Sequence, residues 1–302
     1  MKDINISVII PSYNSKETIG LCLDSLKNQL HGAGYEVIVV DCTSGGTVDG
    51  IVAGYPDIVF IKEHKRFNSG IGRNIGAKIA KGEVIVFLDS DVTLESNALA
   101  KIWTYYKKGY KVFGGALEPN LHFGFSWAGI VKHYFFNHEN QKRRWICQRE
   151  DLSSALLIFD KKIFYDIGWF KDMPRMEDTE LTMRMGKCGV KVFFIPEIIG
   201  YQIQETCFSR ILKEAFISGN NYFFIKYGDE FTLRKRLILG LSLPLIIFVH
   251  AIRTNIHNMA HNGVRGNLIG LITAPVVFYC WIYWALGSYK AVFLNQGISN
   301  ER

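Results

Sequence analysis

Short aliphatic runs alternate with segments of helical periodicity over the first 115 residues. Four runs are rich in valine and isoleucine, which favour strands, and each has the length of a strand buried on both faces. These runs are Ile6–Ile10, Glu36–Val40, Ile58–Lys62 and Val84–Leu88. Apolar residues at helical spacing occur in Lys16–Leu30, Gly70–Lys81 and Leu94–Lys108. The alternation predicts an α/β fold with a Rossmann-like, mostly parallel sheet covered by helices.

The chain continues with less regular patterns. Residues Glu118–Asp151 are irregular and aromatic, typical of a segment that covers a site or rests on a membrane. A strand at Ala155–Phe159, a helix at Lys161–Ile167, a helix opening at Glu177 and a strand at Val192–Ile195 are predicted to complete the globular part.

Beyond Tyr227 the composition changes sharply. Leu233–Ile252 and Leu268–Leu286 are long apolar runs with almost no charge, near the roughly 20 residues that cross a bilayer. Arg234, Lys235 and Arg236 stand just before the uncharged part of the first run, Leu237–Ile252, and favour a cytosolic start. Arg253 and Arg265 between the runs weaken the case for full crossing. Two spans and an interfacial hairpin both stay open. We predict a catalytic domain at residues 1–227 and a membrane-associated helical region at residues 228–302.

Charge and cysteine content narrow the function. The net charge of +7 favours an anionic partner such as phosphate or lipid headgroups. We expect no nucleic acid, because no basic tract interleaved with aromatics and no zinc-finger spacing occurs. The six cysteines form no Cys-x-x-Cys pair, which indicates buried thiols in a reducing compartment. Ile6–Ile10 is too short for the apolar core of a signal peptide, so the first domain is predicted to be cytosolic.

The strongest indication of a functional site in the sequence follows the run Val84–Leu88. Asp89 and Asp91, separated by Ser90, would stand where a parallel strand delivers residues to a ligand crevice. Paired carboxylates suit a hard cation such as Mn²⁺ or Mg²⁺, which can also bind substrate phosphates. The structural alternative is that Asp89 merely ends the strand and Asp91 caps a helix starting near Leu94.

The chain resembles glycosyltransferase family 2, whose members have the GT-A fold and invert the anomeric carbon. The similarity rests on an ordered set of motifs over about residues 4–205: Val8–Asn14, Glu36–Asp41, Gly72–Gly76, Asp89–Asp91, and Glu177–Leu181 with Arg184. It implies a membrane-associated, metal-dependent enzyme of bacterial or archaeal type at the cell membrane. A UDP-sugar is the favoured donor, and the acceptor is a lipid-linked or growing saccharide.

The resemblance also implies roles for single residues. Those expected to bind the donor are Pro11, Tyr13 and Asp41 at the nucleotide, Arg73 at the diphosphate, and Asp89 with Ser90 at the ribose. Asp91 and Asp89 would hold the metal ion, and Asp178, preceded by Glu177, would be the catalytic base. Many family members place a metal-binding histidine where this chain has Tyr201–Gln204. The resemblance therefore predicts a metal site with fewer protein ligands than usual.

Plainer interpretations exist for the same residues. Arg73 could be a surface cation, Asp41 a turn carboxylate, and acidic residues at 177–180 could simply stabilise a helix N-terminus. Glu180 and Arg184 are expected to form an ordinary i,i+4 pair. Two rival functions remain: a haloacid-dehalogenase-like phosphohydrolase that uses Asp89 and Asp91, and a non-catalytic membrane scaffold that binds a nucleotide sugar without turnover.

Overall fold

The computed structural model describes residues 3–30, 32–121, 124–142, 145–203, 207–261 and 263–294; of residues 229, 260, 261 and 263–266 it describes the backbone alone. The chain divides into two compact units. Unit 1 comprises Met1–Glu118, Lys142–Asp172 and Glu177–Ile203, and unit 2 comprises Pro119–Gln141, Met173–Met176 and Gln204–Arg302. The domain boundary placed at residue 227 from the sequence stays a prediction.

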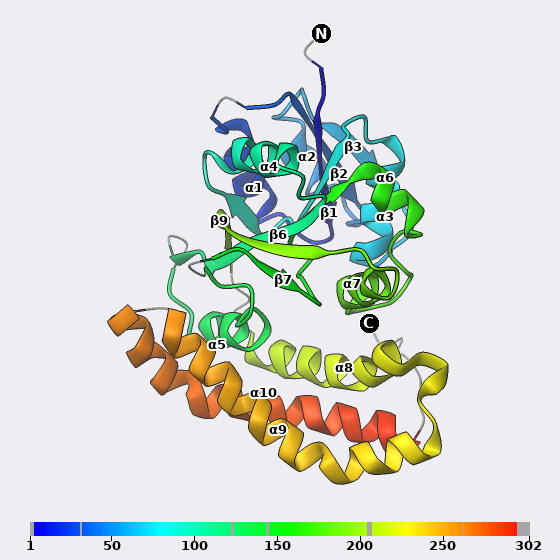
Figure 1. The fold of residues 1–302 in the computed structure, drawn as a ribbon. Helices are drawn as coiled ribbons and strands as arrows, with labels where there is room; N and C mark the ends of the chain where they lie inside the picture. Colours follow the sequence, from blue (N-terminus) through cyan, green and yellow to red (C-terminus); the bar gives the residue numbers. More distant parts are fainter. Residues whose placement is uncertain are drawn as a thin grey trace. The chain divides into compact units, whose positions relative to one another are not determined.

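Unit 1 is built on one mixed sheet (Figure 1). Its parallel part has the order β3 (Val59–Lys62), β2 (Tyr35–Asp41), β1 (Ile6–Ser12) and β4 (Val84–Leu88). The order continues with β8 (Leu156–Asp160), β6 (Val112–Pro119), β9 (Val192–Gln202) and β5 (Val92–Leu94), while β7 (Cys147–Arg149) pairs with β9. Strand β8 runs antiparallel to β4 and β6, and β5 and β7 run antiparallel to β9. The predicted α/β fold is confirmed, although β9 extends well past its predicted end at Ile195.

Helices cover both faces of this sheet. They are α1 (Ile19–Lys27), α2 (Asp49–Val52), α3 (Ser69–Ile79), α4 (Ala98–Lys107), α6 (Lys161–Asp166) and α7 (Glu177–Lys187). Successive residues of a strand point to opposite faces, so Val86 of β4 packs in the cluster that contains α1 and α4, and Phe87 in the cluster that contains α6 and α7. With both faces covered, the carboxyl ends of β1, β2 and β4 are left to carry a site.

The start of helix α4 corrects one interpretation of the acidic motif. Residues Val92–Leu94 pair with β9 as strand β5, and α4 begins only at Ala98. Asp91 therefore precedes a strand and does not cap a helix starting near Leu94.

Glycines bring α3 directly onto β1. A Cβ atom on Gly76 would lie 2.4 Å from Cγ2 of Ile9 in β1, and one on Gly72 would lie 3.1 Å from Cβ of Pro11 in β1 and 2.6 Å from Cε2 of Phe67 in the preceding loop. Only residues without a side chain fit at these positions. The close packing fixes the height of Arg73, which lies between the two glycines, over the end of the sheet.

Unit 2 is helical. It contains α5 (Trp127–Phe136), α8 (Phe208–Tyr227), the 3₁₀ turn η2 (Gly228–Glu230), α9 (Leu233–His261) and α10 (Gly263–Leu294). The expectation of an irregular Glu118–Asp151 segment is wrong where α5 lies, because its apolar residues recur at helical spacing and are buried.

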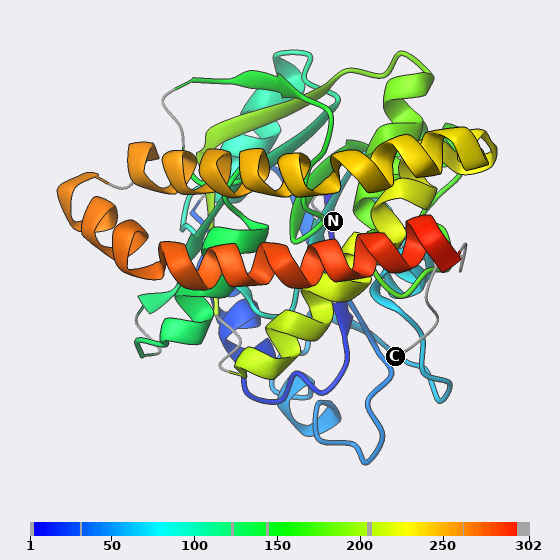
Figure 2. The ribbon, with the colours of Figure 1, turned by 90° about the horizontal axis from the view of Figure 1, so that it is seen from below.

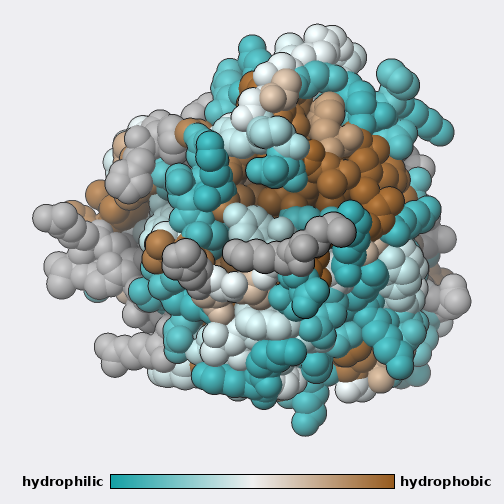
Figure 3. All heavy atoms as spheres, turned by 90° about the horizontal axis from the view of Figure 1, so that it is seen from above, coloured by the Kyte–Doolittle hydropathy of each residue, from teal (hydrophilic) through white to brown (hydrophobic). Residues whose placement is uncertain are grey.

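Helices α9 and α10 form an antiparallel hairpin-like pair (Figure 2). The guanidinium of Arg236 at the start of α9 donates to the carbonyl of Val292 near the end of α10, at 2.7 Å. Leu233–Met259 and Asn267–Leu294 are long and apolar enough to cross a membrane. Figure 3 shows a large hydrophobic area on a face that is otherwise mostly hydrophilic.

Candidate active site

The acidic motif lies at the carboxyl end of β4, where the sequence placed it. The amide of Asp89 donates to the carbonyl of Ala155 at 3.2 Å, and the carbonyl of Asp89 accepts from the amide of Val92 at 3.0 Å. This turn leaves Asp89, Ser90 and Asp91 partly exposed. Burial, together with the negative charge of Asp91 and Asp89, raises the pKa of the Cys22 thiol beneath them, as expected where both carboxylates act on one region.

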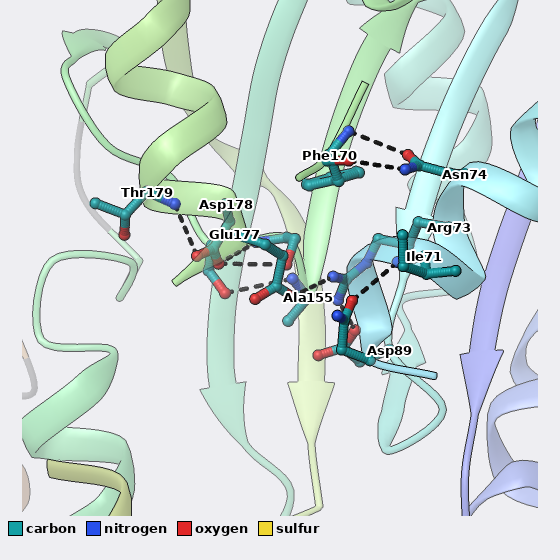
Figure 4. Close-up of polar contacts among 12 residues, drawn as sticks. Ile71, Arg73, Asn74, Asp89, Ala155, Phe170, Glu177, Asp178 and Thr179 are labelled. Carbon is teal, nitrogen blue, oxygen red and sulfur yellow. Dashed lines mark hydrogen bonds and ion pairs between the residues drawn. The ribbon is translucent and has the colours of Figure 1, made fainter. Parts of the chain in front are cut away.

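Arg73 joins this motif to the start of α7 (Figure 4). Its side chain is 2% exposed; Nη2 lies 2.5 Å from Oδ1 of Asp89, and Nη1 lies 2.7 Å from Oε1 of Glu177. Burial alone would lower the pKa of Arg73, but the carboxylates of Asp89, Glu177 and Asp178 outweigh burial and raise it. Arg73 is therefore an internal ion-pair centre and not a surface cation.

The loop before α7 is fastened to α3 by an amide side chain. Asn74 donates to the carbonyl of Phe170 at 2.8 Å and accepts from the amide of Phe170 at 3.1 Å (Figure 4). A side chain that satisfies both polar groups of one backbone residue fixes the loop firmly. Asn74 thus helps to place Glu177 and Asp178, a contribution that sequence reasoning did not assign to it.

Asp178 is held by three donors. Its Oδ2 accepts from the amide of Ser154 at 3.0 Å and from the hydroxyl of Ser154 at 3.2 Å, and its Oδ1 accepts from the amide of Thr179 at 2.8 Å. Beside it, burial raises the pKa of Glu177 despite the opposing charge of Arg73. The structure thus brings Asp89, Glu177 and Asp178 into one cluster around Arg73.

Asp151 is a member of this cluster that sequence reasoning missed. It accepts hydrogen bonds from the hydroxyls of Thr179 at 3.2 Å and Thr182 at 3.1 Å on α7. Burial by the surrounding protein, followed by the charge of Asp178, raises the pKa of Asp151 to about 6. Part of Asp151 is exposed to solvent, and water there reduces the effect. The only sequence signal was the pair of threonines on the same helical face as Asp178.

On the other side of the motif, Asp41 is fully buried at the end of β2. It accepts from the hydroxyls of Ser12 and Thr43, both at 2.7 Å, from the amide of Thr43 at 3.1 Å, and from Nζ of Lys62 at 2.8 Å. Tyr13 is 43% exposed, and the guanidinium carbon of Arg66 lies 4.4 Å from its ring centroid. Pro11 is buried at the end of β1.

The carboxylates of the acidic motif are the candidate ligands for a divalent ion. Among the described side chains, no group of three or more His, Cys, Asp or Glu residues is placed to hold a metal. Asp91 accepts from the amide of Gln202 at 3.3 and 3.2 Å, at the segment where a histidine was expected; Gln204 lies outside the described residues. Mg²⁺ and similar ions bind through one or two carboxylates plus substrate phosphates and water, so Asp89 and Asp91 fit such an ion.

A family model described as glycosyl transferase family 2 matches residues 7–168, which is more than half of the chain. The chain belongs to glycosyltransferase family 2. The match includes Arg73, Asp89 and Asp91 and ends before Glu177 and Asp178. It excludes the phosphohydrolase alternative. The ion pair of Glu180 with Arg184, at 2.8 Å, is also confirmed.

Similar proteins agree with this family. Glycosyltransferase AglE of Haloferax volcanii is 25% identical over 247 residues, covering 78% of this chain and 79% of AglE. The poly(ribitol-phosphate) beta-glucosyltransferase of Bacillus spizizenii is 40% identical over 113 residues, and the poly(ribitol-phosphate) beta-N-acetylglucosaminyltransferase TarP of Staphylococcus aureus is 33% identical over 108 residues. These last two alignments cover 35% and 34% of this glycosyltransferase and only 18% and 33% of those relatives.

Solved structures show the same fold. GalNAc-T7, crystallised with UDP, GalNAc and Mn²⁺, matches with a TM-score of 0.56 at 15% identity. The match covers 77% of this chain and 51% of the GalNAc-T7 chain. TarS of S. aureus matches with a TM-score of 0.54 at 17% identity, over 96% of this chain and 55% of its own. The glycosyltransferase thus spans about half the length of these structures and has the predicted GT-A fold.

Proposed function

We propose that this glycosyltransferase moves a sugar, with inversion at the anomeric carbon, from a nucleotide-sugar donor to a hydroxyl of a lipid-linked or growing polysaccharide acceptor. The observation that carries the proposal is the single ionic cluster formed by Asp89, Arg73 and Glu177, with Asp178 beside it. A UDP-sugar is favoured because the GalNAc-T7 structure holds UDP. Two relatives named for poly(ribitol-phosphate) support a polymeric acceptor.

Asp91 and Asp89 would hold Mn²⁺ or Mg²⁺, which when bound offsets negative charge on the diphosphate leaving group. Arg73 keeps Asp89 in place from within the protein, because one arm of its guanidinium binds Asp89 and the other binds Glu177. In this arrangement both terminal nitrogens of Arg73 bind carboxylates, and the side chain is only 2% exposed. We therefore propose that Arg73 positions the acidic groups around the diphosphate, a more indirect role than the direct contact expected from the resemblance.

Asp178 is the proposed general base. The acceptor oxygen attacks the anomeric carbon, the bond from that carbon to the diphosphate oxygen breaks with its electron pair leaving on the diphosphate, and the acceptor proton passes to Asp178. Ser154 and the amide of Thr179 orient the carboxylate, while a carboxylate has enough lone-pair sites to accept one more donor. A single displacement of this kind inverts the configuration.

The nucleotide side of the site is proposed to lie around Pro11, Tyr13, Asp41 and Ser90. A carboxylate offers about four lone-pair sites, and the four donors from Ser12, Thr43 and Lys62 occupy those of Asp41. Asp41 is thus better suited to fix the wall of the pocket than to bind the base itself. The exposed ring of Tyr13 offers an aromatic face on which a base can stack.

We further propose that the enzyme works at the cytosolic face of the cell membrane, with residues 1–227 catalytic and residues 228–302 as the membrane-associated part. The support is the presence of two helices of membrane-spanning length and apolarity in the chain that carries the catalytic motifs.

The test uses the full-length enzyme in detergent with Mn²⁺ and a panel of nucleotide sugars. Thermal-shift measurements with nucleoside diphosphates identify the base, because a ligand of the native state raises its stability. Asp178→Asn should retain donor binding and lose transfer by about 10²–10⁴-fold, whereas the same change at the exposed Asp166 should leave transfer unchanged. Near-normal turnover of Asp178→Asn would reject the base assignment, and donor binding by wild type without transfer to any acceptor would favour the scaffold alternative.

A further inference from the structure

The helices α9 and α10 each have one apolar face turned outward. On α9, Leu237, Leu241, Leu245, Phe248, Ile252 and Ile256 recur at spacings of three and four residues, and each is more than a third exposed. Leu241, at 87%, is the most exposed of them. On α10, Leu268, Ile272, Tyr279, Ile282, Leu286 and Phe293 form the equivalent exposed stripe.

The opposite faces of both helices are buried and partly polar. Thr254 and Asn258 of α9 and Ser288 of α10 are fully buried. Helices surrounded by lipid on all sides do not require buried polar residues, whereas such residues are common where a helix packs against other parts of a protein. Each helix therefore has a protein face and a bare apolar face.

Near the middle and end of α10, the protein face is covered by α8. A Cβ atom on Gly219 of α8 would lie 1.8 Å from the carbonyl oxygen of Trp284, so the two backbones are in direct contact there. The hydroxyl of Ser288 donates to the carbonyl of Gly219 at 3.1 Å. Helix α8 bears the exposed charges of Arg210, Lys213 and Lys226, which suit water and not hydrocarbon.

At the other end of the hairpin, polar groups that follow α5 cover the same face. Gln141 donates to the side chain of Asn258 at 2.7 Å, and Glu139 pairs with Arg253 at 3.0 Å. Polar segments thus hold the hairpin at both ends. From Leu237 to Ile256 the exposed stripe of α9 is about 29 Å long at 1.5 Å per residue, roughly the full thickness of the hydrocarbon core. A hairpin crossing that core would draw these polar attachments into it.

The charges on α9 and α10 favour an anionic surface as the cover of the bare face. The two helices contain six Arg and Lys residues and no Asp or Glu. An apolar stripe with basic residues suits the headgroup and acyl boundary of an anionic bilayer.

We infer that α9 and α10 lie in the plane of one leaflet of an anionic bilayer, with their outward apolar stripes immersed, and do not cross it. This inference rests on the proposed membrane association and is independent of glycosyl transfer. Both helices then stay on the side of the membrane that carries the catalytic motifs.

Topology is tested in the full-length chain by cysteine labelling. Asn262→Cys places a thiol between α9 and α10, and the exposed Cys188 reports the side of the catalytic unit. Sealed right-side-out and inside-out vesicles from the expression host are treated with a membrane-impermeant maleimide, and both peptides are quantified by mass spectrometry. We expect position 262 and Cys188 to be labelled from the same side. Labelling from opposite sides would show that the hairpin spans, and would overturn the inference.

The apolar surface is tested by co-sedimentation with phosphatidylcholine vesicles, with and without phosphatidylglycerol. Leu241→Lys should lower the partition coefficient about tenfold, the worth of burying one leucine side chain, and phosphatidylglycerol should raise binding of the wild type. Ile79→Lys, at an exposed apolar site in unit 1, is the matched control and should bind as the wild type does. Unchanged vesicle binding by Leu241→Lys would overturn the inference. The inference would also be overturned if the wild type formed a dimer on size-exclusion chromatography, Leu241→Lys lost that dimer, and neither protein bound vesicles. The apolar face would then pack against a second copy of the chain. Turnover is not measured in either experiment, so failure here leaves the transfer proposal standing.

Discussion

Replacing Arg73 by glutamine removes the guanidinium that holds Asp89 and Glu177 together. The side chains of Arg73 and Glu177 are 2% and 11% exposed, so the change leaves a nearly buried carboxylate without its counter-ion. Loss of one partner of a buried pair costs about 3–5 kcal/mol, and because Asp89 is 31% exposed, water replaces part of its contact. We expect a loss of about 3 kcal/mol in unfolding free energy, or roughly 6–12 °C in Tm for a domain of this size.

The loss should depend on pH. Burial raises the pKa of Glu177, and Arg73 opposes that rise, so the pKa of Glu177 rises further in Arg73→Gln. A carboxyl whose folded-state pKa is raised favours the folded state at low pH and loses that stability as pH rises through the folded pKa. The deficit relative to wild type, measured by denaturant unfolding, should therefore be larger near pH 7.5 than near pH 5.

A matched control removes a charge whose pair is exposed. Nζ of Lys107 lies 3.7 Å from Glu83, and both side chains are about half exposed, so Lys107→Gln should change stability by less than about 1 kcal/mol at either pH. The reasoning is refuted if Arg73→Gln loses less than about 1 kcal/mol near neutral pH, or loses the same amount at both pH values.

Three further outcomes are expected. Asp151→Asn should gain Tm relative to wild type at about pH 7.5 and lose that gain at about pH 5, because the raised pKa of Asp151, about 6, means that its ionisation destabilises the fold; a pH-independent difference would contradict this. Gly76→Ala should lower the unfolding free energy by about 1–3 kcal/mol through the clash with Ile9, whereas Gly186→Ala in α7, where no atom lies near the added methyl, should be neutral or stabilising; similar effects at both sites would count against the packing argument. Asp91→Asn should abolish the extra thermal stabilisation that Mn²⁺ gives to bound nucleoside diphosphate, and undiminished Mn²⁺ dependence would remove Asp91 from the metal site.

Strand periodicity and the position of the acidic motif were sufficient to predict the parallel core. Three of the four aliphatic runs became the buried strands β1, β2 and β4, because a strand buried on both faces is largely apolar. The fourth became β3, a partly buried strand at the edge of the sheet. Asp89 could be placed because residues just after such strands collect at one edge. The antiparallel strands that follow were harder to predict. Strand β5 is three residues long, and its pairing with the end of β9 depends on a partner about a hundred residues away.

The partners of the site residues could not be predicted from local pattern. Gly72 and Gly76 were recognised as part of a motif, but their spatial reason, contact with Phe67 and Ile9, appears only in the packed structure. Asp151 was not predicted, since a single acidic residue before a strand has many ordinary explanations and the two threonines on α7 were too weak a signal. In α5, aromatic residues obscured a helical period, because such side chains are equally common in strands and irregular segments.

The ionic cluster gives a physical reason why motifs far apart in the sequence occur together. Arg73 is separated from Asp89 by 16 positions and from Glu177 by 104, and a buried guanidinium is stable only if both carboxylates are present. Loss of Asp89 would leave the charge of Arg73 poorly compensated, and loss of Arg73 would leave Glu177 buried and unpaired next to Asp178. The donor side and the base side of the site are thus coupled through one side chain. Substitution of both Arg73 and Glu177 by glutamine should accordingly cost less stability than the sum of the single changes, and strict additivity would show that the pair does not act as a unit.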